Sequence, residues 1–198
     1  MAHRIVFFGH SHVRRLGEYV ERHENLSNFE LPTTQVVTSF VGRGGLKRKN
    51  VLDPAIISDL RSHSPQTLVM MFGDNDIKKD SSPQEISLMI FSVISAIRAR
   101  VPSIDKVVLV QLLPRYLTRN SWYNKVAERT NLELSYLARH RSYVRFFLCS
   151  FWFPGGRYPR RYSADALLFG PDGVHLNEQG NEKLYDKLKS VVISSSRH

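Results

Sequence analysis

Short runs of apolar residues, rich in β-branched and aromatic side chains, recur along the chain and are typical of buried strands. The predicted strands cover residues 5–8, 36–41, 68–72, 107–112 and 144–148. Between these runs, apolar residues recur at helical spacing, which predicts amphipathic helices. The predicted helices cover residues 13–24, 56–63, 84–100, 123–140 and 179–193.

Predicted strands and helices therefore alternate along the chain. Parallel strands need a crossover, which is usually a helix, so this order predicts an α/β fold with a parallel sheet between two helical layers. A length of 198 residues suits one core, and we expect residues 1–198 to form a single domain. In such sheets the ligand site lies beyond the carboxyl ends of the strands, so chemistry is expected in the residues that follow each strand.

The first predicted strand is followed by Gly9-His10-Ser11-His12. The glycine permits a tight turn, and Ser11 lies where the next helix begins. The positive end of a helix favours negative charge on the serine oxygen and offers backbone N–H groups to an oxyanion. An ordinary N-cap serine would occupy the same position, because serine favours caps.

The second predicted strand is followed by Gly42-Arg43-Gly44-Gly45, where closely spaced glycines let the backbone approach an anionic oxygen. A phosphate-cradling loop would end in Gly-Lys-Ser or Gly-Lys-Thr, and a dinucleotide fingerprint would follow the first strand. Neither pattern is present, so nucleotide binding of these types is disfavoured.

The third predicted strand is followed by Gly-Asp-Asn-Asp at 73–76. The amide of Asn75 is a hydrogen-bond donor at the same edge of the sheet as Ser11 and Gly44, so three donors could converge there. A simple turn explains the same composition, because Gly, Asn and Asp favour turns. A metal pair of Asp74 and Asp76 is disfavoured, since no further oxygen ligands follow at suitable spacing.

Asp172 and His175 lie in the sequence Gly-Pro-Asp-Gly-Val-His-Leu, just before the last predicted helix. In a serine hydrolase a histidine takes the hydroxyl proton, and a carboxylate fixes its tautomer and stabilises its charged form. An aspartate three residues before a histidine can share one face of a loop with it. The pair is therefore a candidate for these two roles.

These four segments, in this order, resemble the SGNH (GDSL-like) hydrolase superfamily. The resemblance implies a flavodoxin-like five-stranded parallel sheet and hydrolysis of carboxylic esters, often acetyl or short acyl esters, without a metal or cofactor. It also implies a nucleophile, a general base and its orienting acid, which are Ser11, His175 and Asp172. The implied oxyanion hole consists of Ser11, Gly44 and Asn75.

The sequence departs from this superfamily at one position, because the usual Gly-Asp-Ser reads Gly-His-Ser, with His10 in place of the aspartate. The departure puts the hydrogen bonds that support the turn in doubt but removes no catalytic group. Gly42 or Gly45 could hold the role given to Gly44. The basic start of the chain also resembles esterase-like domains encoded by retrotransposons.

The chain carries 28 Lys and Arg residues against 18 Asp and Glu residues, a formal net charge of +10. This excess predicts attraction to polyanions. Tyr158 and Tyr162 are interleaved with arginines of the segment 157–161 in a pattern that resembles a nucleic-acid contact strip. The alternative function is therefore a catalytically weak or inactive SGNH-fold module that binds nucleic acid or another polyanion.

The single cysteine, Cys149, excludes an intramolecular disulfide and is expected to be a buried small hydrophobe. No signal peptide or membrane-spanning run is present, which favours an intracellular protein, cytoplasmic or nuclear. The pair His10 and His12 has no obvious third ligand for zinc, so packing and local polar roles are expected. The irregular segment 150–171 is expected to form a loop beside the site.

Overall fold

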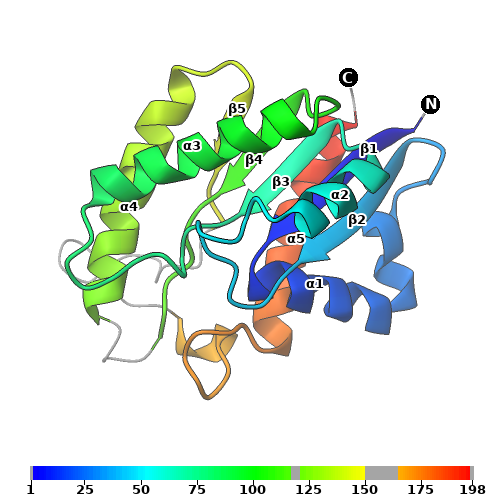
Figure 1. The fold of residues 1–198 in the computed structure, drawn as a ribbon. Helices are drawn as coiled ribbons and strands as arrows, with labels where there is room; N and C mark the ends of the chain where they lie inside the picture. Colours follow the sequence, from blue (N-terminus) through cyan, green and yellow to red (C-terminus); the bar gives the residue numbers. More distant parts are fainter. Residues whose placement is uncertain (1, 117–120, 150–164, 197–198) are drawn as a thin grey trace.

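A computed structural model describes residues 2–116, 121–149 and 165–196. Its five strands form one parallel sheet in the order β2-β1-β3-β4-β5 (Figure 1). The strands are β1 (His3–Gly9), β2 (Val36–Gly42), β3 (Thr67–Met71), β4 (Lys106–Val110) and β5 (Val144–Phe147). This is the flavodoxin-like strand order, in which the direction of winding reverses between β1 and β3 and opens a crevice at their carboxyl ends.

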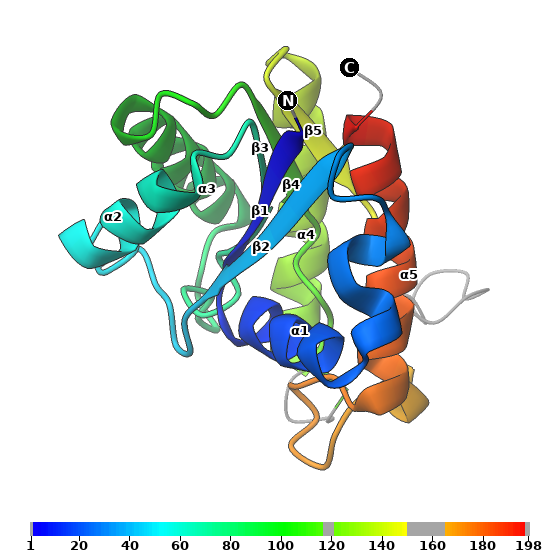
Figure 2. The ribbon, with the colours of Figure 1, turned by 90° about the vertical axis from the view of Figure 1, so that its right-hand side faces the viewer.

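Helices cover both faces of the sheet, which confirms the predicted three-layer α/β fold (Figure 2). Helices α2, α3 and α4 pack on one face, whereas α1 and α5 pack on the other. The helices are α1 (Ser11–Arg22), α2 (Pro54–His63), α3 (Pro83–Arg100), α4 (Ser121–Arg139) and α5 (Glu178–Ser195). Two 3-10 turns, η1 (Glu24–Glu30) and η4 (Ala166–Leu168), precede β2 and α5 respectively.

Residues Ile5–Phe8 of the central strand β1 are apolar on both faces of the strand. Val6 and Phe8 pack into the core shared with α2, α3 and α4, while Ile5 and Phe7 pack into the core shared with α1 and α5. All four side chains are almost fully buried, because helices cover both faces of this strand. Full burial of each such side chain stabilises the fold by about 1.5–3 kcal/mol.

The predicted element boundaries differ from the observed ones by up to two residues. Two strands differ by two residues: β1 begins at His3 rather than Ile5, and β4 ends at Val110 rather than Leu112. Beyond the end of β4, the side chain of Asn131 on α4 takes the place of a neighbouring strand. Its Oδ1 accepts the N–H of Leu112 at 2.8 Å, and its Nδ2 donates to the carbonyl oxygen of Leu112 at 3.0 Å. A side-chain amide thus ends the strand where the apolar run continues.

Cys149 is buried against the sheet in the core formed with α1 and α5, which confirms the prediction of a small buried hydrophobe. Burial raises the pKa of its thiol to about 12, so the group stays protonated at neutral pH. Among the helices that the structure describes, none combines the length and apolar character needed to cross a membrane.

Candidate active site

The turn between β1 and α1 presents Ser11 at the first position of the helix. A Cβ atom at Gly9 would lie 2.0 Å from the backbone oxygen of Met71, so only glycine lets β1 and β3 approach this closely. The N-cap of α1 is His10, whose side chain accepts a hydrogen bond from the N–H of His12 at 3.5 Å. Ser11 is therefore not the N-cap residue, and its hydroxyl is free for another partner.

That partner is His175, which lies between Ser11 and Asp172. The Nε2 atom of His175 is 3.0 Å from the Ser11 Oγ, and its Nδ1 atom is 2.6 Å from Oδ2 of Asp172. A carboxylate only accepts hydrogen bonds, so Nδ1 carries the ring proton. The neutral ring then leaves Nε2 free to accept the hydrogen bond of the serine hydroxyl. Residues 164 positions apart in the sequence thus form one hydrogen-bonded line.

The loop before α5 fixes Asp172 and His175 relative to each other. Asp172 Oδ1 accepts the backbone N–H groups of Val174 and His175, both at 2.9 Å. The carbonyl oxygen of His175 accepts the N–H of Gly170 at 2.8 Å, which closes the loop. Partial burial raises the pKa of Asp172, but the hydrogen bonds from the His175 side chain and from the loop outweigh it and hold the pKa well below its usual range.

A small hollow opens beside Ser11 at the carboxyl ends of β1, β3 and β4. Asn75 lines this hollow, and its side-chain Nδ2 also donates to the carbonyl oxygen of Leu46 at 3.1 Å. Gly44 is exposed and does not line it, and a Cβ atom built on Gly44 would meet nothing within 4 Å. The structure therefore brings Ser11, Asn75 and His175 to one place, while the role of Gly44 stays a prediction.

Beneath Ser11 lies a buried polar cluster that sequence reasoning missed. His10 Nε2 is 2.6 Å from Oδ2 of Asp74, and the hydroxyl of Tyr123 on α4 donates to Oδ1 of Asp74 at 2.9 Å. Because His10 Nδ1 accepts the N–H of His12, Nε2 carries the ring proton and donates it to Asp74. Burial raises the pKa of Asp74, but pairing with His10 outweighs it and keeps Asp74 ionised.

The histidine that replaces the usual aspartate in Gly-His-Ser is His10, and the structure pairs it with the buried Asp74. Both residues lie at the strand ends that carry Ser11 and Asn75, so the rule of inspecting strand ends pointed to them individually. What the sequence did not reveal was their contact, since nothing in either motif shows that the two side chains meet.

Arg115 also lines the hollow and was missed. It follows Leu113-Pro114 at the end of the β4 apolar run, where the same strand-end rule could have found it. Its guanidinium lies over the ring of Tyr123 at 3.9 Å, and its Nη2 donates to the carbonyl oxygen of Asp74 at 3.4 Å.

His12 is buried next to this cluster, and its Nδ1 atom has no hydrogen-bond partner among the described residues. Burial, followed by the neighbouring His10, lowers the pKa of His12 from 6.5 to about 3. Between these two values the unfolded chain binds more protons at His12 than the folded chain, so stability rises with pH and is lost as the pH falls.

We therefore expect the free energy of unfolding to fall by up to about 1.4 kcal/mol per pH unit through His12 as the pH drops from 6.5 towards 4. Urea denaturation across this range measures the slope. His12→Gln removes the titrating group and should flatten the slope, whereas His63→Gln on the surface of α2 should not. Equal slopes in the two variants would contradict this assignment.

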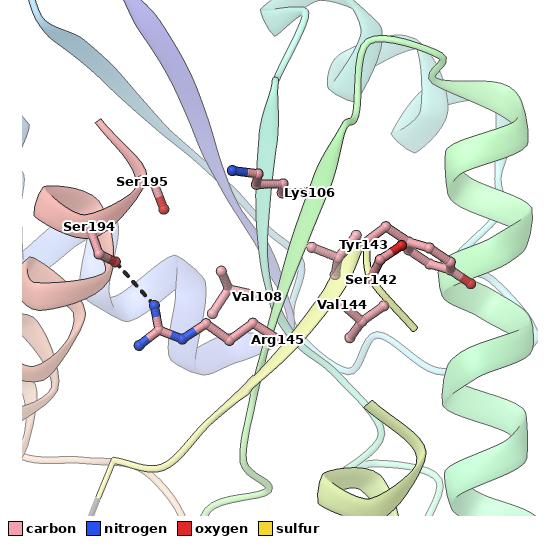
Figure 3. A pocket seen from close by; sticks show the side chains of 9 residues that line it. Lys106, Val108, Ser142, Tyr143, Val144, Arg145, Ser194 and Ser195 are labelled. Atoms are coloured by element: carbon pink, nitrogen blue, oxygen red, sulfur yellow. Dashed lines mark hydrogen bonds between the residues drawn. The ribbon is translucent and has the colours of Figure 1, made fainter. Parts of the chain in front are cut away.

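A larger pocket lies at the opposite, amino-terminal end of β4 and β5, next to the end of α5 (Figure 3). Its volume is ≈ 170 Å³, and Arg145 donates across it to the hydroxyl of Ser194 at 3.2 Å. Its described lining contains no histidine or carboxylate, so its serines have no such base beside them there. The hollow beside Ser11 is therefore the better candidate for ester chemistry.

Two further predictions concern charge and metals. Within the described ranges, no group of three or more His, Cys, Asp or Glu side chains is placed to hold a metal ion. Of the predicted loop 150–171, residues 165–171 are described and include the 3-10 turn η4 (Ala166–Leu168). Residues 150–164, with Tyr158, Tyr162 and the arginines of 157–161, lie outside the described residues, so that part of the loop and the contact strip stay predictions.

A parallel sheet with Ser11, His175 and Asp172 in one hydrogen-bonded line at its carboxyl end is typical of serine hydrolases with a flavodoxin-like α/β fold. The chain belongs to the GDSL-like Lipase/Acylhydrolase family, whose sequence profile matches residues 8–188. It is accordingly a carboxylic ester hydrolase. No significant match is found among curated protein sequences.

Solved structures share the fold at low sequence identity. A GDSL-like lipase from Bacteroides thetaiotaomicron is 17% identical, with 97% of this chain and 88% of that chain covered and a TM-score of 0.66. A carbohydrate esterase family 3 protein from Talaromyces cellulolyticus is 17% identical, with 100% and 99% covered and a TM-score of 0.65. A variant acetyl esterase with an acetate ion is 17% identical, with 100% and 99% covered and a TM-score of 0.66.

Proposed function

We propose that this chain hydrolyses carboxylic esters with Ser11 as the nucleophile, His175 as the general base and Asp172 as the group that orients His175. The observation that carries the proposal is the 3.0 Å contact between the Ser11 hydroxyl and Nε2 of a histidine whose other nitrogen is 2.6 Å from a carboxylate. His175 takes the proton as Ser11 attacks the acyl carbon, then returns it to the leaving alcohol. Water releases the acyl group by the same path.

The negative oxygen that develops during attack needs hydrogen-bond donors. As the first residue of α1, Ser11 has a backbone N–H without an intrahelical partner, and it lies at the positive end of the helix. Asn75 uses one amide hydrogen on Leu46 and keeps a second for the oxyanion. Gly44, or its neighbours Gly42 and Gly45, supplies the third donor in this proposal.

The acyl group in this proposal is acetyl or short. The hollow beside Ser11 is small, with a volume of ≈ 10 Å³, which favours a small acyl group over a long chain. The solved acetyl esterase holding an acetate ion has the same fold, which is consistent with a small acyl group.

A fluorophosphonate probe tests the proposed nucleophile directly. The probe phosphonylates a serine that is activated by a histidine, so intact-protein mass spectrometry should show one adduct, and peptide mapping should place it on Ser11. Ser11→Ala should abolish labelling, and Ser82→Ala, which removes the N-cap serine of α3, should leave it unchanged. Absence of labelling, or an adduct on another residue, would contradict the assignment.

We also propose that residues 1–198 form a single domain, since both core clusters share one sheet. Polyanion binding stays a prediction from the net charge of +10, because the arginine–tyrosine segment lies outside the described residues. The intracellular location is likewise untested. The resemblance to retrotransposon-encoded domains receives no support from the comparisons.

A further inference from the structure

Arg115 lies close to the path of an ester that Ser11 would attack. It lines the same hollow as Ser11. The next residue, Tyr116, donates its backbone N–H to the carbonyl oxygen of Gly173 at 2.8 Å, so this segment is attached to the loop that carries His175. The guanidinium and the reacting groups therefore share one rigid edge of the sheet.

The arginine is held in place before any ligand binds. Its guanidinium lies 3.9 Å from the ring centroid of Tyr123, and Nη2 donates to the carbonyl oxygen of Asp74 at 3.4 Å. Its own backbone N–H donates to the side chain of Asn124 at 2.8 Å. Stacking on an aromatic ring orients the planar fork of an arginine, which lowers the entropy lost when that fork binds an anion.

No Asp or Glu carboxylate of the described residues forms an ion pair with Arg115. Every Asp and Glu side chain of the sequence lies within the described residues, because positions 117–120 and 150–164 contain neither type. Arg115 forms no ion pair with any of them. Three carboxylates in the loops at this end of the sheet bond other groups, and they are Asp74, Asp76 and Asp172.

A basic segment lies near Asn75, which lines the hollow with Arg115. Asn75 donates to the carbonyl oxygen of Leu46, which places the exposed run Lys47–Lys49 next to it. Positive charge near a site raises the local concentration of anionic ligands and their rate of encounter.

We propose that Arg115 binds an anionic group, a carboxylate or a phosphate, on the ester that Ser11 hydrolyses, so that the substrates of this site are negatively charged esters. This inference rests on the proposed function, because it assigns a substrate class to the same site. An arginine fork can bind either group with two parallel N–H···O bonds.

The test compares pairs of esters that differ only in charge. The acetyl esters 3- and 4-acetoxybenzoate place a carboxylate on the alcohol side, and their methyl esters remove it. The mono-4-nitrophenyl ester of adipic acid places a carboxylate on the acyl side, and its methyl ester removes it. A phosphate arm uses 4-acetoxyphenyl phosphate and its dimethyl ester. The ratio of kcat/KM within each pair is measured for each variant, which cancels intrinsic reactivity.

Arg98 offers a matched control for Arg115→Gln. Its guanidinium lies 4.0 Å from the ring centroid of Tyr143 and its Nε donates to the carbonyl oxygen of Ile104 at 3.3 Å, so its setting is similar. Tyr143 lines the pocket at the opposite end of the sheet (Figure 3). Arg98→Gln therefore removes one positive charge and one stacked arginine without touching the hollow.

We expect Arg115→Gln to lower the charged-to-neutral ratio by about tenfold or more for at least one pair, since a hydrogen bond to a charged group is stronger than one between neutral groups. Arg98→Gln should leave every ratio within about twofold of the wild type. The pair that responds identifies the side of the ester that carries the charge. Unchanged ratios, or an equal loss on charged and neutral esters, would overturn the inference while Ser11-dependent hydrolysis still stood.

A binding measurement separates this inference from the proposed function. Ser11→Ala protein should bind intact 4-acetoxybenzoate or 4-acetoxyphenyl phosphate in calorimetry, and adding Arg115→Gln should weaken that binding by about tenfold. If no ester is hydrolysed through Ser11 but this difference persists, the proposed function fails and the anion site stands. If hydrolysis is intact and neither measurement responds to Arg115→Gln, only the anion site fails.

Discussion

Ser11→Ala is expected to lower kcat/KM for p-nitrophenyl acetate by about four to six orders of magnitude, the range seen when the serine of a Ser-His-Asp arrangement is removed. The reason is that the variant lacks the hydroxyl that lies 3.0 Å from His175 and that attacks the acyl carbon. Donors for the oxyanion remain, so a residual rate above the uncatalysed reaction should persist. Stopped-flow and steady-state release of p-nitrophenol measure both rates.

The matched control is Ser82→Ala. Ser82 caps α3 and accepts the N–H of Glu85 at 3.4 Å, so its loss should cost about 1 kcal/mol of stability and leave the rate unchanged.

Longer acyl homologues of the substrate complete the experiment. A steep fall in rate beyond acetyl would agree with the small hollow, whereas activity that survives in Ser11→Ala would sink the assigned nucleophile.

The sheet could be predicted from the sequence because strands and helices are recognised from the residues of one segment at a time. Apolar runs such as Ile5–Phe8 have no polar side chain to face solvent, so they must be buried on both faces. The helical segments between the runs connect one strand to the next, which favours parallel crossover connections. The positions of Ser11, Asn75, Asp172 and His175 followed from strand ends and from the resemblance to a family. These are properties that one segment can carry alone.

What the sequence could not supply was contact between segments. The N-cap of α1 is His10 rather than Ser11. The His10 imidazole also contacts Asp74, which follows β3, and this contact joins two segments that are far apart in the sequence. Tyr123 and Arg115 complete that cluster from α4 and the end of β4, and neither belongs to a motif. Their roles depend on distances across the sheet edge, which sequence spacing does not encode.

The buried His10–Asp74 pair leads to the prediction with the largest effect on stability. His10→Asp restores the Gly-Asp-Ser sequence usual in the resembling superfamily, yet it is expected to destabilise this protein by about 3–5 kcal/mol. The change removes the 2.6 Å donor from a buried carboxylate and places a second carboxyl group beside it. Tyr123 then remains as the side-chain donor to Asp74, at 2.9 Å.

Two ionised carboxylates in a buried site repel each other, so one of them should take up a proton. Folding of His10→Asp should therefore be coupled to proton uptake near neutral pH. Its stability relative to the wild-type protein, in which His12 titrates as well, should increase as the pH falls from 7 towards 5. This is the opposite of the direction expected from His12 in the wild-type protein. The opposite sign distinguishes carboxylate repulsion from a general loss of packing.

A second substitution tests whether Asp74 is the cause. Asp74→Asn in the His10→Asp background removes one carboxylate and offers an amide to the other, so the double variant should regain about 2 kcal/mol or more relative to His10→Asp alone. Urea denaturation of the wild type, both single variants and the double variant gives the coupling energy between the two positions. Additive effects, or a His10→Asp variant within about 1 kcal/mol of the wild type, would mean that the pair does not explain the Gly-His-Ser departure.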